Sequence, residues 1–351
     1  MPFTLIAGPC SAENREQTLS TAEQLLPLTR LQIAQEPLRF IFRAGLWKPR
    51  THPESFSGVG TEGLPWLEEV RERYGFEVST EVASAEHLES CISSGIHYLW
   101  LGARTTANPF LVQRIADYLK SLSTSKKDEL TLIVKNPINA DIDIWVGAVE
   151  RLLQSGIEHI WLVHRGFSSA TPTQLMRNQP LWSLPIEMHR RFPTLPLLSD
   201  PSHLTGDASK VPVVAQQAVS MGFNGLMIEA HCCPKSALSD AQQQLTPQQL
   251  IELMTNLRLP KPASADAQLE QYRQSINEVD EQIWELIVQR MDIVKHIGEY
   301  KREKGLSVFQ HDRYEHILKS RLDWATDHNL SADLVKKIVE AIHEEALRKQ
   351  L

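Results

Sequence analysis

The chain contains eight short apolar runs of strand length, and these constrain its fold more than any other feature of its 351 residues. They span residues 4–7, 38–42, 76–79, 98–101, 130–134, 157–163, 195–199 and 225–228. Each run is almost continuously hydrophobic, as is typical of parallel strands buried on both faces. Helix-like stretches separate the runs at intervals of about 25 to 35 residues, which predicts repeated strand–helix units. Eight such units are enough to close an α/β fold into a (β/α)8 or TIM barrel.

A charged or metal-ligating residue stands at or just after the end of each run. These residues are Cys10, Arg43, Glu81, Arg104, Lys135, Arg165, His203 and Glu229. The active sites of (β/α)8 barrels lie where the strands end, at their carboxyl termini. We therefore expect the eight side chains to converge on one pocket.

The barrel accounts for only part of the chain, because such a barrel needs about 250 residues. A closing helix is expected over residues 245–257, and the proline-rich segment 259–265 reads as a linker. Beyond it the strand pattern stops, and helices are predicted over about residues 266–304, 312–326 and 331–349. Gly305 is expected to end the first helix and Ser331 to cap the last. The expected domains are a barrel at 1–258 and a small all-α domain at 266–351.

Composition excludes several classes of protein. Hydrophobic residues make up 42% of the chain and charged residues 23%, as in a folded protein with an ample core. The net charge of -7 argues against a partner that is nucleic acid or an anionic membrane. No apolar run approaches about 18 residues, and no cationic signal segment begins the chain, so neither a membrane span nor a signal peptide is expected. The four cysteines form no disulfide framework, which favours the cytoplasm.

Four residues form a candidate metal set: Cys10, His203, Glu229 and Asp240. Each has an ordinary alternative as a buried thiol or a paired polar residue at a strand end. Together they offer sulfur, nitrogen and two carboxylates at one barrel mouth, which suits a divalent Mn, Fe, Co or Zn ion. Cys232 and Cys233 compete as ligands but are adjacent, so their side chains diverge. A redox pairing of Cys10 with Cys233 stays open.

Six cations lie at or just after strand ends, next to apolar runs where an unpaired charge is costly. They are Arg43, Lys48, Arg50, Arg104, Lys135 and Arg165. With a divalent metal and its three anionic ligands, the site keeps a net charge of about +5, and each phosphate carries up to about -2. The balance predicts two phosphorylated substrates, one of which also has a carboxylate.

Several motifs of residues 1 to about 258 together resemble 3-deoxy-D-arabino-heptulosonate 7-phosphate (DAHP) synthase of the shorter bacterial type I class. They are Gly-Pro-Cys-Ser at 8–11, Lys-Pro-Arg-Thr at 48–51, Gly-Ala-Arg-Thr at 102–105, Lys-Asn at 135–136, Arg-Gly at 165–166, Asp-Pro-Ser-His at 200–203, Glu229 and Asp240. The resemblance implies a metal-dependent condensation of phosphoenolpyruvate (PEP) with erythrose 4-phosphate, the first step of the shikimate pathway.

The resemblance also implies roles for individual residues. Cys10, His203, Glu229 and Asp240 would hold the metal. Arg104 and Arg165 would bind the PEP phosphate, and Lys135, Arg43 and Lys48 would surround its carboxylate and reacting carbons. Arg50 and Thr51 would bind the aldose phosphate.

The expected chemistry assigns two further roles as hypotheses: Lys48 donates a proton, and Glu81 orients the attacking water. Two features depart from the family pattern, namely His164, where relatives often have an acid, and the pair Cys232 and Cys233.

In the long predicted helix, an apolar stripe recurs at helical spacing. Its members are Ile276, Val279, Ile283, Leu286, Ile293 and Ile297. Arg290 falls on this stripe, and Lys301 lies about 20° round and roughly 16 Å along, so both are expected to point into the same apolar face. Arg273 lies about 25 Å from Arg290 on a straight helix, so only another copy of the chain can bring them together. The alternative for Arg290 is a surface arginine with a half-buried stem.

Arg273, Arg290, Lys301 and Arg313, with Gln350 as a less certain member, resemble the all-helical chorismate mutases over residues 266–351. The resemblance implies the cofactor-free rearrangement of chorismate to prephenate in a homodimer formed through the helical domain, each site borrowing one arginine. Gln310 and Tyr314 depart from the Asp and Glu that relatives often have.

Two alternatives stay open at this point. The barrel shares features with 3-deoxy-D-manno-octulosonate 8-phosphate (KDO 8-phosphate) synthase, but Lys-Pro-Arg-Thr at 48–51 differs from the Lys-Ala-Asn-Arg usual in that family. The helical domain is alternatively a dimerising, ligand-sensing regulator of the barrel. If both sites are active, prephenate or chorismate is expected to inhibit the condensation.

Overall fold

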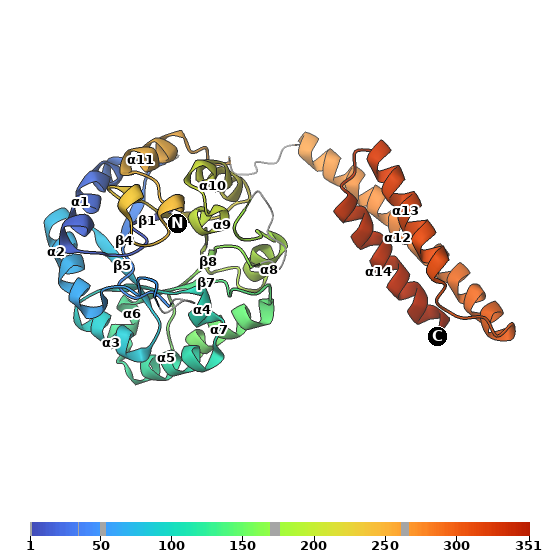
Figure 1. Ribbon diagram of the computed structural model, residues 1–351, viewed down its shortest axis with the longest axis horizontal. Coiled ribbons are helices and arrows are strands. Elements are labelled where there is room, and N and C mark those ends of the chain that lie inside the picture. Colours follow the sequence, from blue (N-terminus) through green and yellow to red (C-terminus); the bar gives the residue numbers. More distant parts are fainter. Residues whose placement is uncertain (1, 34, 50–53, 169–175, 261–266) are drawn as a thin grey trace. The chain divides into compact units, whose positions relative to one another are not determined.

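Eight parallel strands close into a barrel in the order β1-β10-β9-β8-β7-β6-β5-β4 (Figure 1). We analysed a computed structural model, which describes residues 2–33, 35–49, 54–168, 176–260 and 267–351. The barrel strands are β1 (Thr4–Gly8), β4 (Arg39–Arg43), β5 (Glu77–Val82), β6 (Tyr98–Leu101), β7 (Thr131–Lys135), β8 (Ile160–His164), β9 (Leu197–Ser199) and β10 (Gly225–Glu229). All eight predicted runs therefore form strands. The short hairpin of β2 (Gln32–Ile33) and β3 (Glu36–Pro37) was not predicted.

Helices surround the barrel, as the strand–helix rhythm predicts (Figure 1). They are α1 (Arg15–Leu25), α2 (Leu64–Tyr74), α3 (Ala85–Ser93), α5 (Pro109–Ser121), α7 (Ile142–Gln154), α8 (Ser183–Arg191), α10 (Val211–Ser220) and α11 (Pro247–Asn256). Three shorter helices are α4 (Ala103–Thr106), α6 (Thr124–Glu129) and α9 (Pro201–Thr205). The short 3-10 turn η5 (Ala241–Gln243) follows Asp240. None of the described helices combines the length and hydropathy needed to cross a membrane.

Two layers of apolar side chains arise from the alternation of side chains along each strand. The inner layer fills the barrel with Ile6, Ile41, Trp100, Ile133, Trp161, Val163, Leu198 and Met227. The outer layer lies between strands and helices and includes Leu5, Phe42 and Leu162. The barrel is therefore a packed core, and the space for chemistry lies at the strand ends.

Contacts divide the chain into two compact units, Met1–Pro260 and Lys261–Leu351. The second unit contains α12 (Ala267–Glu303), α13 (His311–Asp327) and α14 (Ala332–Gln350). Gly305 follows α12 with a φ of +64°, and the Ser331 side chain accepts a hydrogen bond from the backbone N–H of Leu334. The predicted signal that ends α12 and the predicted cap that begins α14 are thus both present.

The apolar stripe predicted for α12 is not covered within one chain. Ile276, Val279, Ile283, Leu286, Ile293 and Ile297 are all exposed within one chain. Val294 and Lys301 are buried instead, and Gly298 lies so close to α14 that a Cβ there would be 2.9 Å from the Cα of Gln350. Arg290, which lines a cavity, and Lys301, which is buried, are partly or fully covered within one chain, whereas the stripe residues between and before them are open to water. Its own unit therefore covers only part of the apolar surface of α12.

Candidate active sites

Four site residues lie two positions beyond residues of the inner barrel layer. Arg43 follows Ile41, Lys135 follows Ile133, Arg165 follows Val163 and Glu229 follows Met227. Because strand side chains alternate with a period of two, this spacing turns all four side chains toward the barrel axis. The same apolar pattern that builds the core therefore places the charges at its mouth.

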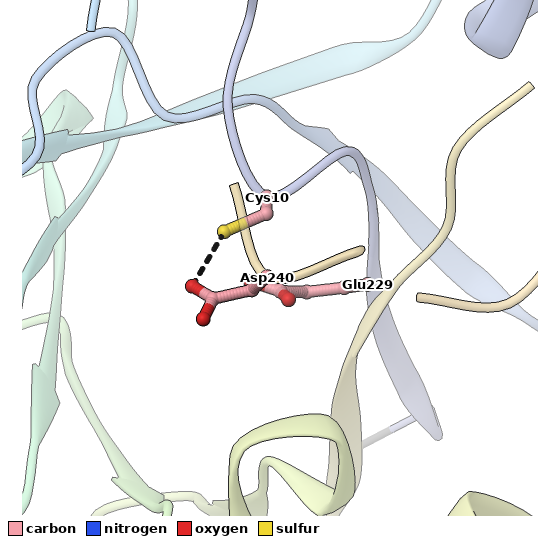
Figure 2. Close-up of side chains that lie close together, drawn as sticks. All are labelled: Cys10, Glu229 and Asp240. Atoms are coloured by element: carbon pink, nitrogen blue, oxygen red, sulfur yellow. Dashed lines mark hydrogen bonds between the residues drawn. The ribbon is translucent and has the colours of Figure 1, made fainter. Parts of the chain in front are cut away.

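Cys10, Glu229 and Asp240 lie together at this mouth, with their possible ligand atoms within 4.8 Å of one another (Figure 2). Cys10 follows β1, Glu229 ends β10 and Asp240 precedes η5. Cys10 Sγ lies 3.3 Å from Asp240 Oδ2. His203, on α9, approaches through Nε2, which is 3.6 Å from Glu229 Oε1. The structure thus places all four predicted metal ligands in one corner.

The donor atoms of this corner fit a divalent cation. Glu229 is completely buried, and its Oε1 accepts no hydrogen bond from the residues that the structure describes. Sulfur, imidazole and carboxylate donors together suit Mn, Fe, Co or Zn. Burial, followed by the charge of Glu229, raises the pKa of the Cys10 thiol to about 12. A bound cation would oppose both effects, since metal coordination requires the thiolate.

Partners that the sequence analysis did not predict hold these ligands. Gln243 Nε2 donates to Glu229 Oε2 at 2.7 Å, and Arg177 Nη1 donates to Asp240 Oδ1 at 2.9 Å. The backbone N–H of Cys10 donates to Gln244 Oε1 at 3.0 Å. No spacing signal marked these residues, because their partners lie far away in the chain.

Asp200 contacts both the metal corner, formed by Cys10, His203, Glu229 and Asp240, and the cationic wall, formed by the predicted cations at the strand ends. Its Oδ2 lies 2.8 Å from His203 Nδ1 and 2.7 Å from Lys135 Nζ. Burial opposes the charge of this carboxylate, but His203 and Lys135 outweigh it and hold the pKa of Asp200 well below its usual value. Asp200 therefore stays anionic and orients both neighbours.

A cavity of about 300 Å³ opens beside the corner, lined by the predicted cations Lys48, Arg104, Lys135 and Arg165 and by Glu81, His203 and Asp240. Lys48 Nζ lies 3.0 Å from Cys10 Sγ. Burial opposes the charge of Lys48, but Cys10, Glu81 and Glu229 outweigh it and raise the lysine's pKa. Arg177 and Asn178 also line the cavity and were missed by the sequence analysis.

Arg43 does not line this cavity and is completely buried. Its Nη2 lies 3.1 Å from Glu229 Oε1 and 3.2 Å from the carbonyl oxygen of Cys10. Its Cζ stands 4.7 Å from the centre of the Trp100 ring. Arg50 and Thr51, predicted to bind the aldose phosphate, lie outside the described residues.

In the second unit, α12 and α14 bring three predicted residues into the helix packing. Lys301 is buried, and its Nζ donates to the carbonyl oxygen of Val308 at 2.7 Å. Gln350 is buried, and Arg290 is partly buried. Arg290 and Arg313 line a cavity of about 410 Å³. Arg273 is exposed on the amino-terminal part of α12, where it pairs with Glu270 at 3.4 Å.

Comparison with known proteins identifies both units. Residues 1–259 match the model of the DAHP synthetase I family. The chain belongs to that family. Residues 272–351 match the model of chorismate mutase type II, so the chain carries two enzyme domains, a DAHP synthase barrel and a chorismate mutase.

Individual relatives support the barrel assignment. A phospho-2-dehydro-3-deoxyheptonate aldolase of Thermotoga maritima is 32% identical over 259 residues, covering 73% of this chain and 69% of the relative. A 2-dehydro-3-deoxyphosphooctonate aldolase of Helicobacter pylori is 29% identical over 272 residues, covering 72% of this chain and 93% of the relative. The crystal structure of a T. maritima DAHP synthase matches with a TM-score of 0.60 and 30% identity, over 73% of this chain and 68% of that one.

Proposed function

We propose that the DAHP synthase barrel condenses PEP with D-erythrose 4-phosphate to give DAHP and inorganic phosphate. The cation-lined cavity beside Cys10, Glu229 and Asp240 carries this proposal. A cavity with five lining cations, the four predicted ones and Arg177, suits two phosphorylated substrates. The ligand set next to it suits an aldehyde that must be activated.

The overall reaction adds one water and releases one phosphate. C3 of PEP forms a bond to the aldehyde carbon, and the aldehyde oxygen takes up a proton. Water adds its oxygen to C2 and gives up a proton, and the resulting phosphohemiketal loses phosphate by cleavage of the C–O bond. The cationic wall stabilises the negative charge that moves during these steps.

Cys10, His203, Glu229 and Asp240 would hold a divalent Mn, Fe, Co or Zn ion. When bound, such an ion supplies Lewis acidity toward the aldehyde oxygen. Gln243, Arg177 and Asp200 keep its ligands oriented, as partners of metal ligands commonly do.

Charge and position support the substrate-binding roles expected from the resemblance. Arg104 and Arg165 bind the PEP phosphate, whereas Lys135, Arg43 and Lys48 face its carboxylate and reacting carbons. Arg43 is buried next to the cavity. Two of its nitrogens, Nε and Nη1, have no hydrogen-bond partners among the described residues, which leaves donors for a bound anion. Arg50 and Thr51 bind the aldose phosphate.

Lys48 donates a proton during the reaction, and Glu81 orients the water. Both side chains line the cavity, and Lys48 is buried with its ammonium group favoured by neighbouring anions. The Glu81 carboxylate lies so close to Gly102 that any side chain at position 102 would collide with it. This contact supports a fixed carboxylate that can orient a water molecule by accepting a hydrogen bond from it.

KDO 8-phosphate synthesis is the second candidate for the barrel, because 2-dehydro-3-deoxyphosphooctonate aldolases are among the relatives. An eight-carbon product requires a five-carbon aldose phosphate in place of erythrose 4-phosphate. The deciding assay follows PEP consumption with either aldose phosphate, after removal of metal and again after its return. We expect turnover with erythrose 4-phosphate and loss of turnover without metal.

The mutase domain rearranges chorismate to prephenate and needs no cofactor. Arg290, Lys301 and Arg313 bind the two carboxylates and stabilise the breaking ether oxygen, with Gln350 beside them. The chain forms a homodimer through this domain, and Arg273 reaches the site of the partner subunit. The exposed apolar side chains of α12 support the dimer, because such a surface is rarely left open to water.

Mixing two inactive variants tests the shared site. Arg273→Ala and Arg290→Ala chains, mixed one to one and allowed to exchange, are expected to recover about a quarter of the wild-type mutase activity. Half of the dimers are then mixed, and each mixed dimer has one intact site. A mixture that stays inactive would show that Arg273 acts within its own chain, and an Arg273→Ala variant that is active by itself would show that Arg273 has no part in the reaction.

A dimerising, ligand-sensing role for the helical domain is the alternative to catalysis. Loss of chorismate, followed with the full chain, separates the two functions. Feedback by prephenate or chorismate is compatible with catalysis and predicts slower PEP consumption at saturating prephenate; equal rates would exclude it. A cytoplasmic location fits these substrates and the four free cysteines.

A further inference from the structure

Three buried side-chain atoms of the helical unit have no hydrogen-bond partner within the part of the chain that the structure describes. They are Arg290 Nη1, His343 Nε2 and Gln350 Oε1. Buried polar atoms are nearly always paired in folded proteins, so an unpaired one that lines a cavity is available to a water molecule or a ligand there. Arg290 and Gln350 belong to the proposed mutase site. His343 shares their property and has no role in the mechanism described above.

His343 lies on the wall of the same cavity as Arg290 and Arg313. Its ring packs against Tyr314, with ring centres 4.5 Å apart, and against Phe309 at 5.9 Å. Burial, together with the charges of Arg290 and Lys301, lowers the pKa of His343. The imidazole is therefore neutral at pH 7 and has one nitrogen able to accept a hydrogen bond.

A neutral acceptor supplies what the cations of this site lack. Arginine and lysine side chains only donate hydrogen bonds, so they pair well with carboxylates but cannot accept the proton of a hydroxyl group. The proposed substrate carries a ring hydroxyl in addition to its two carboxylates. Burying that hydroxyl without an acceptor would weaken binding.

We propose that His343 is a substrate-binding residue of the mutase site, whose Nε2 accepts a hydrogen bond from the ring hydroxyl of chorismate. The inference rests on the proposed mutase function. It assigns the hydroxyl a partner on α14, whereas the carboxylates pair with cations from α12 and α13.

The test uses the full chain and two substrates, chorismate and the analogue that lacks the ring hydroxyl. His343→Phe keeps the ring packing against Tyr314 and removes the acceptor, and His343→Gln keeps an acceptor. We expect His343→Phe to lower kcat/KM for chorismate about 10- to 100-fold and for the analogue less than about threefold. His343→Gln should retain most of the activity, and His316→Leu, at an exposed position on α13, should change neither value.

Two outcomes would overturn the inference. The first is an unchanged kcat/KM for chorismate in His343→Phe. The second is an equal loss on both substrates, which would show that His343 only supports the fold; His343→Leu repeats the comparison with a smaller side chain. Absence of chorismate turnover in the wild-type chain would instead refute the mutase function itself.

Discussion

His164 and Arg165 are neighbours in sequence but face opposite sides of the barrel wall. Arg165 lines the cavity, whereas His164 is buried outside the strands against Phe167, Trp182 and Phe223. The alternation of a strand decides this separation. His164, where relatives often have an acid, is therefore part of the packing between strand and helices and lies away from the substrate cavity.

His164 should make the barrel sensitive to acid. Burial lowers the pKa of His164 from 6.5 to about 3. Unfolding lets this side chain take up a proton once the pH falls below 6.5, so the free energy of unfolding decreases progressively from there toward pH 3. Protonation of this histidine in the unfolded chain is expected to make the free energy of unfolding about 2 kcal/mol lower at pH 5 than at pH 7.5. Denaturant unfolding of His164→Phe at both pH values should show a correspondingly smaller acid loss.

The control for this prediction is His189→Phe, because His189 is exposed on α8. It should lose as much stability between pH 7.5 and pH 5 as the wild-type chain. Identical acid losses in the wild type and His164→Phe would contradict the prediction.

Lys48 is expected to be essential for the condensation. Lys48→Met removes the proposed proton donor and should lower turnover of PEP with erythrose 4-phosphate by about 10²- to 10⁴-fold. Because Lys48 Nζ also contacts Cys10 Sγ, the metal dissociation constant must be measured in the same variant. Lys120→Met, at an exposed position on α5, is the matched control. Near-normal turnover in Lys48→Met would refute the role.

At the scale of elements, the loop from Ser239 to Gln244 holds the metal corner together. The hydroxyl oxygens of Ser239 and Ser11 are 2.7 Å apart, and Gln244 Oε1 accepts a hydrogen bond from the backbone N–H of Cys10. Gln243 holds Glu229, and Asp240 itself adopts a left-handed backbone conformation with φ of +47°. Hydrogen bonds from several elements keep Asp240 in this uncommon conformation, which aims its carboxylate toward Cys10.

Gln243 should control metal affinity without touching the metal. Gln243→Leu keeps the volume of this buried side chain and removes its hydrogen bond to Glu229, so the metal dissociation constant should rise about 10- to 100-fold. Competition with a chelator measures this constant without substrate. Gln113→Leu, at a half-buried position on α5, should leave it unaltered. Equal constants in the wild type and Gln243→Leu would refute the role of Gln243, whereas a wild-type chain that binds no metal would refute the site.

At the scale of the whole molecule, two compact units occupy one chain, and among the described residues the second unit leaves a long row of apolar side chains exposed on α12. Ile276, Leu286 and Ile293 on α12 are each about 60% exposed. This 37-residue helix packs mainly against α14, so much of its apolar surface is left to water within one chain. In the proposed homodimer, a second copy of the chain covers this surface and also supplies Arg273.

A charge on this face should separate the dimer. Ile283→Glu is expected to convert the chain from dimer to monomer in sedimentation and to abolish mutase activity, because a buried unpaired carboxylate is costly. PEP consumption by the barrel should persist. Ile186→Glu, the same change on the exposed surface of α8, is the control and should remain dimeric. A dimeric Ile283→Glu would place the interface elsewhere.

Patterns within short stretches of sequence were sufficient to predict the strands and the three helices of the second unit. They also predicted that Cys10, His203, Glu229 and Asp240 lie close together. Side chains alternate along a strand, and the strands of a closed barrel end at one rim. The sequence alone therefore placed Arg43, Lys135 and Glu229 at the same barrel mouth. The family resemblance added their expected roles.

Only the tertiary structure decided which side chains hold these residues and which helix faces are covered. Gln243, Arg177 and Asp200 act through partners contributed by separate elements, and no local pattern encodes such contacts. Likewise, the stripe of α12 is apolar in sequence whether a neighbour helix or a second chain covers it. Packing of α14 against Gly298 and Lys301, a long-range event, leaves that stripe exposed and brings His343 to the cavity.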